Sequence, residues 1–146
     1  MFHRLLPLLI ALFMPFTAAL GAKQPIAVIV HPDSGVSHIT REEAVNIFMG
    51  RQKRLSSGLV ALPIEQAKPE ETRARFYKLL VNKAIAEINA YWARLYFTGQ
   101  AQPPRQAQTP EEVLELVATN KGAIGFVERE KVDRRVREVL VLEGGP

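Results

Sequence analysis

The chain has 146 residues, a formal net charge of +4 and no cysteine. This length fits one domain, and the lack of cysteine excludes disulfides, thiol nucleophiles and a lipid anchor on an N-terminal cysteine. Basic residues cluster at 51–54 and 134–137, but no aromatic residues alternate with them to stack on bases. The charge therefore predicts a solvated basic surface, and we expect no nucleic acid as a partner.

Residues 1–22 have the pattern of a secretory signal peptide. Arg4 gives a positive start, an almost wholly apolar run continues to Phe16, and small residues follow. A transmembrane anchor is the alternative, but the run is short for a bilayer and contains two prolines. We predict cleavage after Gly21 or Ala22, which leaves a soluble periplasmic protein without a membrane anchor.

The apolar run Ile26–Val30 predicts the first strand. It is rich in β-branched residues and has no polar member, which is typical of a strand buried on both faces. Thr40 and Glu43 then have the spacing of a capping box, in which the threonine hydroxyl accepts a hydrogen bond from the later backbone N–H. We expect a helix after Thr40 that ends at Gly50.

A second strand is predicted at Val60–Ile64, and the segment after it, EQAKPEETRARF at 65–76, has the composition of a helix start. Pro69 suits the first helical position. The two glutamates that follow it fall in the first turn, where the helix dipole favours negative charge. Glu71 and Arg75 are four residues apart and are expected to pair.

The second half of the chain predicts two helices, two strands and one loop. In chain order these are helix 84–97, loop 100–108, helix 110–120, strand 123–127 and strand 136–142. Apolar residues at spacings of three and four mark both helices, and a capping box at Thr109 opens the later one. The aromatic residues of 91–97, Trp92 among them, are expected in the core rather than in a ligand-binding box.

Strands that alternate with helices indicate an α/β domain over residues 23–146. We expect a mixed sheet flanked by helices on both faces, because the first strand is apolar throughout. No internal repeat or low-complexity block divides the chain.

Few residues could carry catalysis. The candidates lie in one loop and are His31, Ser34, Ser37 and His38. They lack a third group to orient a nucleophile and its base. The histidines with Asp33 could suggest zinc, but spacings of two and five residues fit no common pattern and a fourth ligand is missing. With no glycine-rich phosphate loop either, we predict no enzyme, no metal and no cofactor.

Four stretches of the chain carry a resemblance to a known family. They are IAVIVHPDSGVSHITREEAVNIFMGR, LPIEQAKPEETRARF, YWARLYFTG and LELVATNKGAIGFVE. Their order resembles the second lobe of phosphate-binding proteins of the PstS type, the periplasmic solute-binding components of phosphate ABC transporters. The last stretch is similar to the family's V…PGAIGYV segment and is the most specific of the four. The resemblance implies one lobe of a type II periplasmic-binding-protein fold, with the N-terminal lobe absent.

The helix start at 69–72 departs from the family's phosphate site. The family's arginine, aspartate, glycine, serine, glycine and threonine fall on Gln66, Lys68, Pro69, Glu70, Glu71 and Thr72. Proline lacks the N–H that a glycine would donate. Two carboxylates also occupy the positive end of the helix, where the anion would sit. We therefore expect the anion site to be degenerate.

The resemblance implies a periplasmic phosphate or oxyanion substrate-binding-like protein related to phosphate ABC transport. Its ligand-binding residues would be Ser34, Ser37, Gln66 and Thr72. Its partners would be phosphate or another small anion, and an ABC permease or other periplasmic protein. The alternative is a non-carrier interaction module that docks on another periplasmic protein through the face a second lobe would cover. A homodimer, in which a second copy replaces the missing lobe, is a third option.

Overall fold

Five strands form one mixed sheet in the computed structural model, which describes residues 24–144; the predicted signal peptide lies outside the described residues. The strands are β1 (Ile26–Val30), β2 (Leu62–Gln66), β3 (Arg105–Ala107), β4 (Ala123–Glu128) and β5 (Arg137–Leu142). Their order across the sheet is β3-β2-β4-β1-β5. β1 runs antiparallel to β4 and β5, whereas β2 runs parallel to β3 and β4. The predicted α/β class with a mixed sheet is confirmed.

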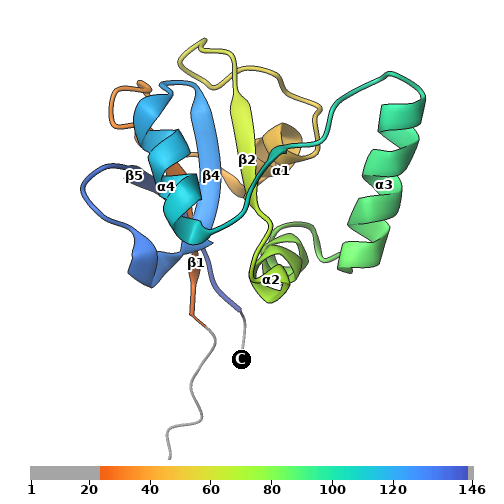
Figure 1. The fold of residues 1–146 in the computed structure, drawn as a ribbon. Helices are drawn as coiled ribbons and strands as arrows, with labels where there is room; N and C mark the ends of the chain where they lie inside the picture. Colours follow the sequence, from red (N-terminus) through yellow and green to blue (C-terminus); the bar gives the residue numbers. More distant parts are fainter. Residues whose placement is uncertain (1–23, 145–146) are drawn as a thin grey trace, which may run out of the picture.

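Helices cover both faces of this sheet. They are α1 (Arg41–Phe48), α2 (Glu70–Val81), α3 (Ile85–Phe97) and α4 (Pro110–Thr119), with a short 3-10 turn at Arg129–Lys131. α4 covers one face, and α1 and α2 cover the other, while α3 lies farthest from the sheet (Figure 1). The described chain begins and ends at the lower edge in this view, because Ile26 at the start of β1 pairs with Leu142 at the end of β5.

The core has two parts, one on each side of the sheet. All five side chains of β1 are fully buried, as expected for a central strand whose two faces are both covered. Under α1 and α2, the rings of Phe76 and Phe126 stack with centroids 3.7 Å apart, and Phe48 meets both edge-on. Under α4, Val113 and Val117 pack over Gly125, whose missing side chain lets the helix approach the sheet.

Both predicted capping boxes have the expected threonine bond. Thr40 Oγ1 accepts from the N–H of Glu43 at 3.1 Å, and Thr109 Oγ1 accepts from the N–H of Glu112 at the same distance. Gly50 follows α1 with a φ of 75°, a left-handed conformation that glycine adopts without strain. These local signals placed the helix ends correctly.

Three element predictions need correction. β2 starts two residues later than expected and extends to Gln66, because the buried polar residues at its end are part of the strand. Residues 105–107, expected in a loop, form the edge strand β3 through backbone pairing with β2. Pro69 precedes the first helical residue, Glu70, and so occupies the N-cap position of α2, without a side-chain capping hydrogen bond, instead of the first helical position.

Two side-chain predictions are also wrong. Trp92 is buried, but Tyr96 and Phe97 are 62% and 85% exposed, because the end of α3 extends beyond the elements it packs on. Arg75 does not pair with Glu71. Its Nη2 lies 3.8 Å from Oε1 of Glu128 and donates to the carbonyl oxygen of Gln24 at 2.7 Å.

Candidate functional site

The start of α2 lies where the parallel strands end. β2 runs parallel to β3 and β4, so their carboxyl ends meet at one edge of the sheet. α2 begins four residues after β2, at Glu70. In α/β sheets this edge is the common position for ligands, and a helix start supplies N–H donors and a positive dipole end to an anion there.

The hydroxyl and the backbone N–H of Thr72 both donate hydrogen bonds to acceptors within the protein. Its side chain is buried, and its Oγ1 donates to Oε1 of Glu128 at 3.4 Å. Its backbone N–H donates to the carbonyl oxygen of Pro69 at 3.1 Å. Pro69 has no N–H, and no side chain caps the helix. The donors that would hold an anion are therefore reduced in number.

Three carboxylates surround this helix start. Glu70 and Glu71 are exposed in its first turn. Glu128 reaches it from the end of β4 and is 3.8 Å from Arg75. Negative charge at this end of a helix is favourable because it offsets the dipole. The same charge opposes a free anion at the same place.

A hollow of about 520 Å³ lies beside the helix start, between α2, α3 and β3. Its charged lining residues are Lys68, Glu70, Glu71 and Arg73, and its uncharged polar ones are Asn89, Gln106 and Gln108. Arg73 is already paired, because its Nε lies 2.7 Å from Oε1 of Glu65. The hollow thus offers an incoming anion two glutamates against one unpaired lysine, among the residues that line it.

Sequence reasoning missed a buried polar network under this hollow. Glu65 is 2% exposed and accepts three hydrogen bonds: from Arg73 Nε at 2.7 Å, Tyr77 Oη at 2.7 Å and Gln106 Nε2 at 3.1 Å. Burial, and then the nearby Glu65 carboxylate, raise the pKa of Tyr77 well above its ordinary value near 10. The network joins α2 to β2 and β3. Its only sequence signal was a glutamate beside the apolar part of a strand.

The four predicted ligand residues do not form one site. Gln66 and Thr72 lie at the carboxyl end of β2. Ser34 and Ser37 follow β1, which runs antiparallel to β4 with Val30 opposite Ile124, so their loop lies at the other end of the sheet. In Figure 1 this loop is the orange segment at the upper left, whereas α2 is at the bottom. The predicted joint site is corrected to two separate positions.

The individual side chains differ in exposure as well. Gln66 is 1% exposed, and neither its Oε1 nor its Nε2 has a partner among the described residues. Because strand residues alternate, Gln66 faces the α4 side of the sheet and Glu65 the α2 side. Ser34 is buried, with its Oγ accepting from the N–H of Val36 at 3.2 Å, whereas Ser37 is exposed.

Within residues 24–144, no three His, Cys, Asp or Glu side chains come together in a way that could hold a metal ion. His31 Nδ1 accepts from the N–H of Asp33 at 2.9 Å. No helix of the described part of the chain has the length and apolar character to cross a bilayer.

Comparison with known proteins identifies the fold. No protein-family model matches the chain, and no curated protein does. Among solved structures, it is similar to an ABC-type phosphate transport receptor from Vibrio cholerae, with a TM-score of 0.64 and 18% identity. That match covers 81% of this chain and 46% of the other.

Two further solved structures are similar to the chain over a similar share of its length. A putative phosphate ABC transporter substrate-binding protein from Clostridium perfringens, solved with bound phosphate, has a TM-score of 0.64 at 20% identity, covering 81% of this chain and 45% of that one. PstS from Borrelia burgdorferi has a TM-score of 0.58 at 16% identity, and the match covers 84% of this chain and 47% of that one. The chain spans about half the length of the structures it matches. Its fold is that of one lobe of a periplasmic-binding protein.

Proposed function

We propose that the protein works in phosphate transport, as a periplasmic single-lobe relative of substrate-binding components whose oxyanion site at the start of α2 is degenerate. The observation that supports this most is the position of α2. It begins at the carboxyl ends of parallel strands, in a lobe whose fold recurs in phosphate-binding proteins. The proposed ligand position is the backbone at residues 70–72, with Thr72 behind it; Gln66 ends β2 nearby, with its side chain on the α4 side of the sheet.

Electrostatics make free phosphate a weak ligand at this position. Phosphate esters carry about −1.5 to −2 at neutral pH, and inorganic phosphate carries a similar charge. Two like charges about 4 Å apart cost about 1 kcal/mol in water and several times that when partly buried. Such an anion meets this repulsion from both Glu70 and Glu71. Lys68 is exposed, and exposed charges offset little of it.

Calorimetric titration of the purified exported protein with phosphate and sulfate, at low and moderate salt, tests this proposal. We expect no saturable micromolar binding in the wild type. The double variant Glu70→Ser with Glu71→Gly should gain phosphate binding, since it removes two negative charges. The variant Glu42→Ser with Glu43→Gly makes the same change at the start of α1 and should gain none. Micromolar phosphate binding by the wild type would refute a degenerate site.

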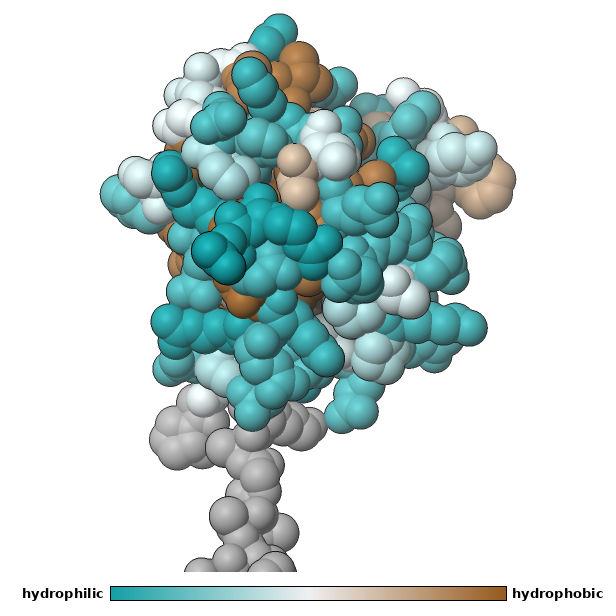
Figure 2. Space-filling model, turned by 60° about the vertical axis from the view of Figure 1, so that its left-hand side comes forward, coloured by the Kyte–Doolittle hydropathy of each residue, from teal (hydrophilic) through white to brown (hydrophobic). Residues whose placement is uncertain are grey.

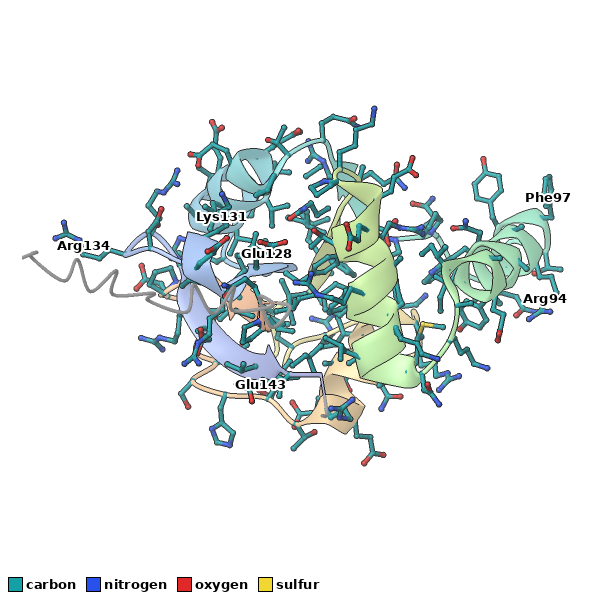
Figure 3. All side chains as sticks on the ribbon, turned by 90° about the horizontal axis from the view of Figure 1, so that it is seen from below. Arg94, Phe97, Glu128, Lys131, Arg134 and Glu143 are labelled. Atoms are coloured by element: carbon teal, nitrogen blue, oxygen red, sulfur yellow. The ribbon has the colours of Figure 1, made fainter. Side chains whose placement is uncertain are left out.

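Docking on another periplasmic protein is a second candidate function. We keep it as the alternative because the hydroxyl and the backbone N–H of Thr72 both donate to acceptors of the same chain and so do not need an anion. The face proposed for docking contains the two ends of the described part of the chain and is seen in Figure 3, where Glu128, Lys131 and Glu143 lie around it. Failure of the double variant to gain any anion binding would favour this candidate over the first.

A further inference from the structure

A second hollow of about 520 Å³ lies at the opposite end of β2 from the start of α2. Its walls are the end of α1, the segment between α1 and β2, and the end of α3 with the loop after it. Its apolar lining residues are Ile47, Val60, Ala61, Pro63, Tyr96 and Ala101. A hollow with this lining can receive apolar side chains, which distinguishes it from the glutamate-lined hollow beside α2.

The large exposed apolar residues of the described chain gather around this second hollow. Val60 is 64% exposed, Tyr96 62% and Phe97 85%, and Leu59 at 37% precedes Val60. The rings of Tyr96 and Phe97 meet edge-on, with centroids 5.9 Å apart. Figure 3 shows Phe97 at the outer end of α3, away from the sheet, with Arg94 beside it. By contrast, the side of the molecule that carries α4 is mostly hydrophilic (Figure 2).

The charged residues in and beside this hollow are mostly basic. Lys53 is the one charged residue among the described residues that line it, which include no carboxylate. Arg51 and Arg94 are close to lining residues along the chain, and they line a neighbouring hollow together with Lys83 and Glu87. In that neighbouring hollow Glu87 is paired with Lys83, whose Nζ lies 3.5 Å from Oε2 of the glutamate. An occupant would therefore meet an apolar floor with one lysine, and a net positive charge beside it.

We propose that this surface, named here the α3-end groove, binds an acidic segment of a partner protein that carries an aromatic or aliphatic anchor residue. The anchor would enter the hollow beside Tyr96, and flanking carboxylates would meet Lys53 and Arg94. Buried aromatic anchors supply most of the energy of such contacts, and opposite charges at the rim supply specificity and association rate. A hollow favours a segment with a projecting side chain over the flat surface of a membrane.

This inference does not depend on the anion site. The α3-end groove adjoins the amino end of β2, whereas α2 starts beyond its carboxyl end, so each site can fail without the other. The groove also differs from the face with Glu128, Lys131 and Glu143, which is the one proposed above for docking.

Fluorescence anisotropy with two labelled synthetic peptides tests the proposal. One has a phenylalanine and a leucine flanked by aspartate and glutamate, and the other has lysines in place of all the acids. We expect the full chain to bind the acidic peptide at least tenfold more tightly than the basic one, with an affinity that falls as salt rises. Equal affinity for the two peptides, or none for either, would overturn the proposal.

Variants then locate the binding. We expect two double variants each to lower the affinity for the acidic peptide about tenfold, within the range seen for interface anchors. One is Lys53→Glu with Arg94→Glu, and the other is Tyr96→Ser with Phe97→Ser. Lys131→Glu with Arg134→Glu makes the same charge change away from the groove and should have little effect. An equal loss in this control would show a non-specific charge effect and overturn the proposal. So would binding to vesicles of phosphatidylglycerol and phosphatidylethanolamine without peptide binding. Circular dichroism checks that every variant is folded.

Discussion

Thr72 Oγ1 lies 3.4 Å from Oε1 of Glu128, although the two residues are 56 positions apart in the chain. The contact brings the end of β4 to the first turn of α2 and adds a third carboxylate to a helix start that already has two. A residue that could be a ligand is thus tied to an acid of the same chain.

Replacement of Glu128 by glutamine should strengthen anion binding where binding exists. In the Glu70→Ser, Glu71→Gly background, we expect Glu128→Gln to lower the phosphate Kd about fivefold, which corresponds to about 1 kcal/mol for one like charge removed at short range. It also frees Arg75 from its carboxylate partner. Glu115→Gln on the exposed side of α4 is the control. A Kd that changes equally in both variants would contradict a local role for Glu128.

Loss of the buried carboxylate of Glu65 should destabilise the protein strongly. Glu65→Leu leaves Arg73 and the Tyr77 hydroxyl without their acceptor in the interior. Removing one partner of a buried charge pair costs about 3–5 kcal/mol. Urea unfolding followed by circular dichroism measures this loss of unfolding free energy. Glu115→Leu, an exposed change of the same kind, should alter the unfolding free energy by less than about 0.5 kcal/mol. Similar values for the two variants would show that the network contributes little.

Tyr77 should make the protein sensitive to alkali. Its pKa in the folded state is raised, chiefly by burial, above the value near 10 that it regains on unfolding. Between these two values the folded state holds a proton that the unfolded state has lost, so stability decreases as pH rises above 10. Urea unfolding of the wild type and Tyr77→Phe across this range measures the difference. We expect the variant to lose less stability with rising pH; parallel curves would be evidence against this titration.

Gly122 is expected to tolerate no side chain. A Cβ at this position would lie 2.2 Å from the carbonyl oxygen of Val60, a backbone atom that cannot move independently. Overpacking of this kind costs about 1–3 kcal/mol, so Gly122→Ala should lower the thermal midpoint by several degrees. Gly144→Ala is the matched control, because its nearest neighbour would be Leu79 at 3.9 Å. An unchanged midpoint for Gly122→Ala would mean that β2 and β4 are less closely packed at this end.

The local elements could be predicted from the sequence because their causes are local. The Thr40 and Thr109 caps act within three residues, and β1 is apolar at every position. β3 could not be predicted, since Arg105 and Gln106 are exposed and the strand exists through backbone pairing with β2. No local pattern encodes that pairing.

The candidate site could be predicted only in part. The negative charge at the start of α2 comes from neighbouring residues of the sequence, and Glu70 and Glu71 were correctly predicted in its first turn. The partners of Glu65 lie 8, 12 and 41 residues away, so its network depends on the tertiary fold. The expectation that Ser34 and Thr72 share a site failed for a similar reason. A sequence does not state at which end of a sheet a loop lies; the strand directions decide it.

The most direct measurement is anomalous scattering from crystals soaked in arsenate, a phosphate analogue whose arsenic atom can be located unambiguously. Wild-type crystals and crystals of the Glu70→Ser, Glu71→Gly variant would be soaked under the same conditions. We predict an ordered arsenate against the backbone nitrogens of residues 70–72 in the variant and no ion there in the wild type. An ordered arsenate at these nitrogens in the wild type would contradict the claim that the chain's own carboxylates already neutralise this helix start.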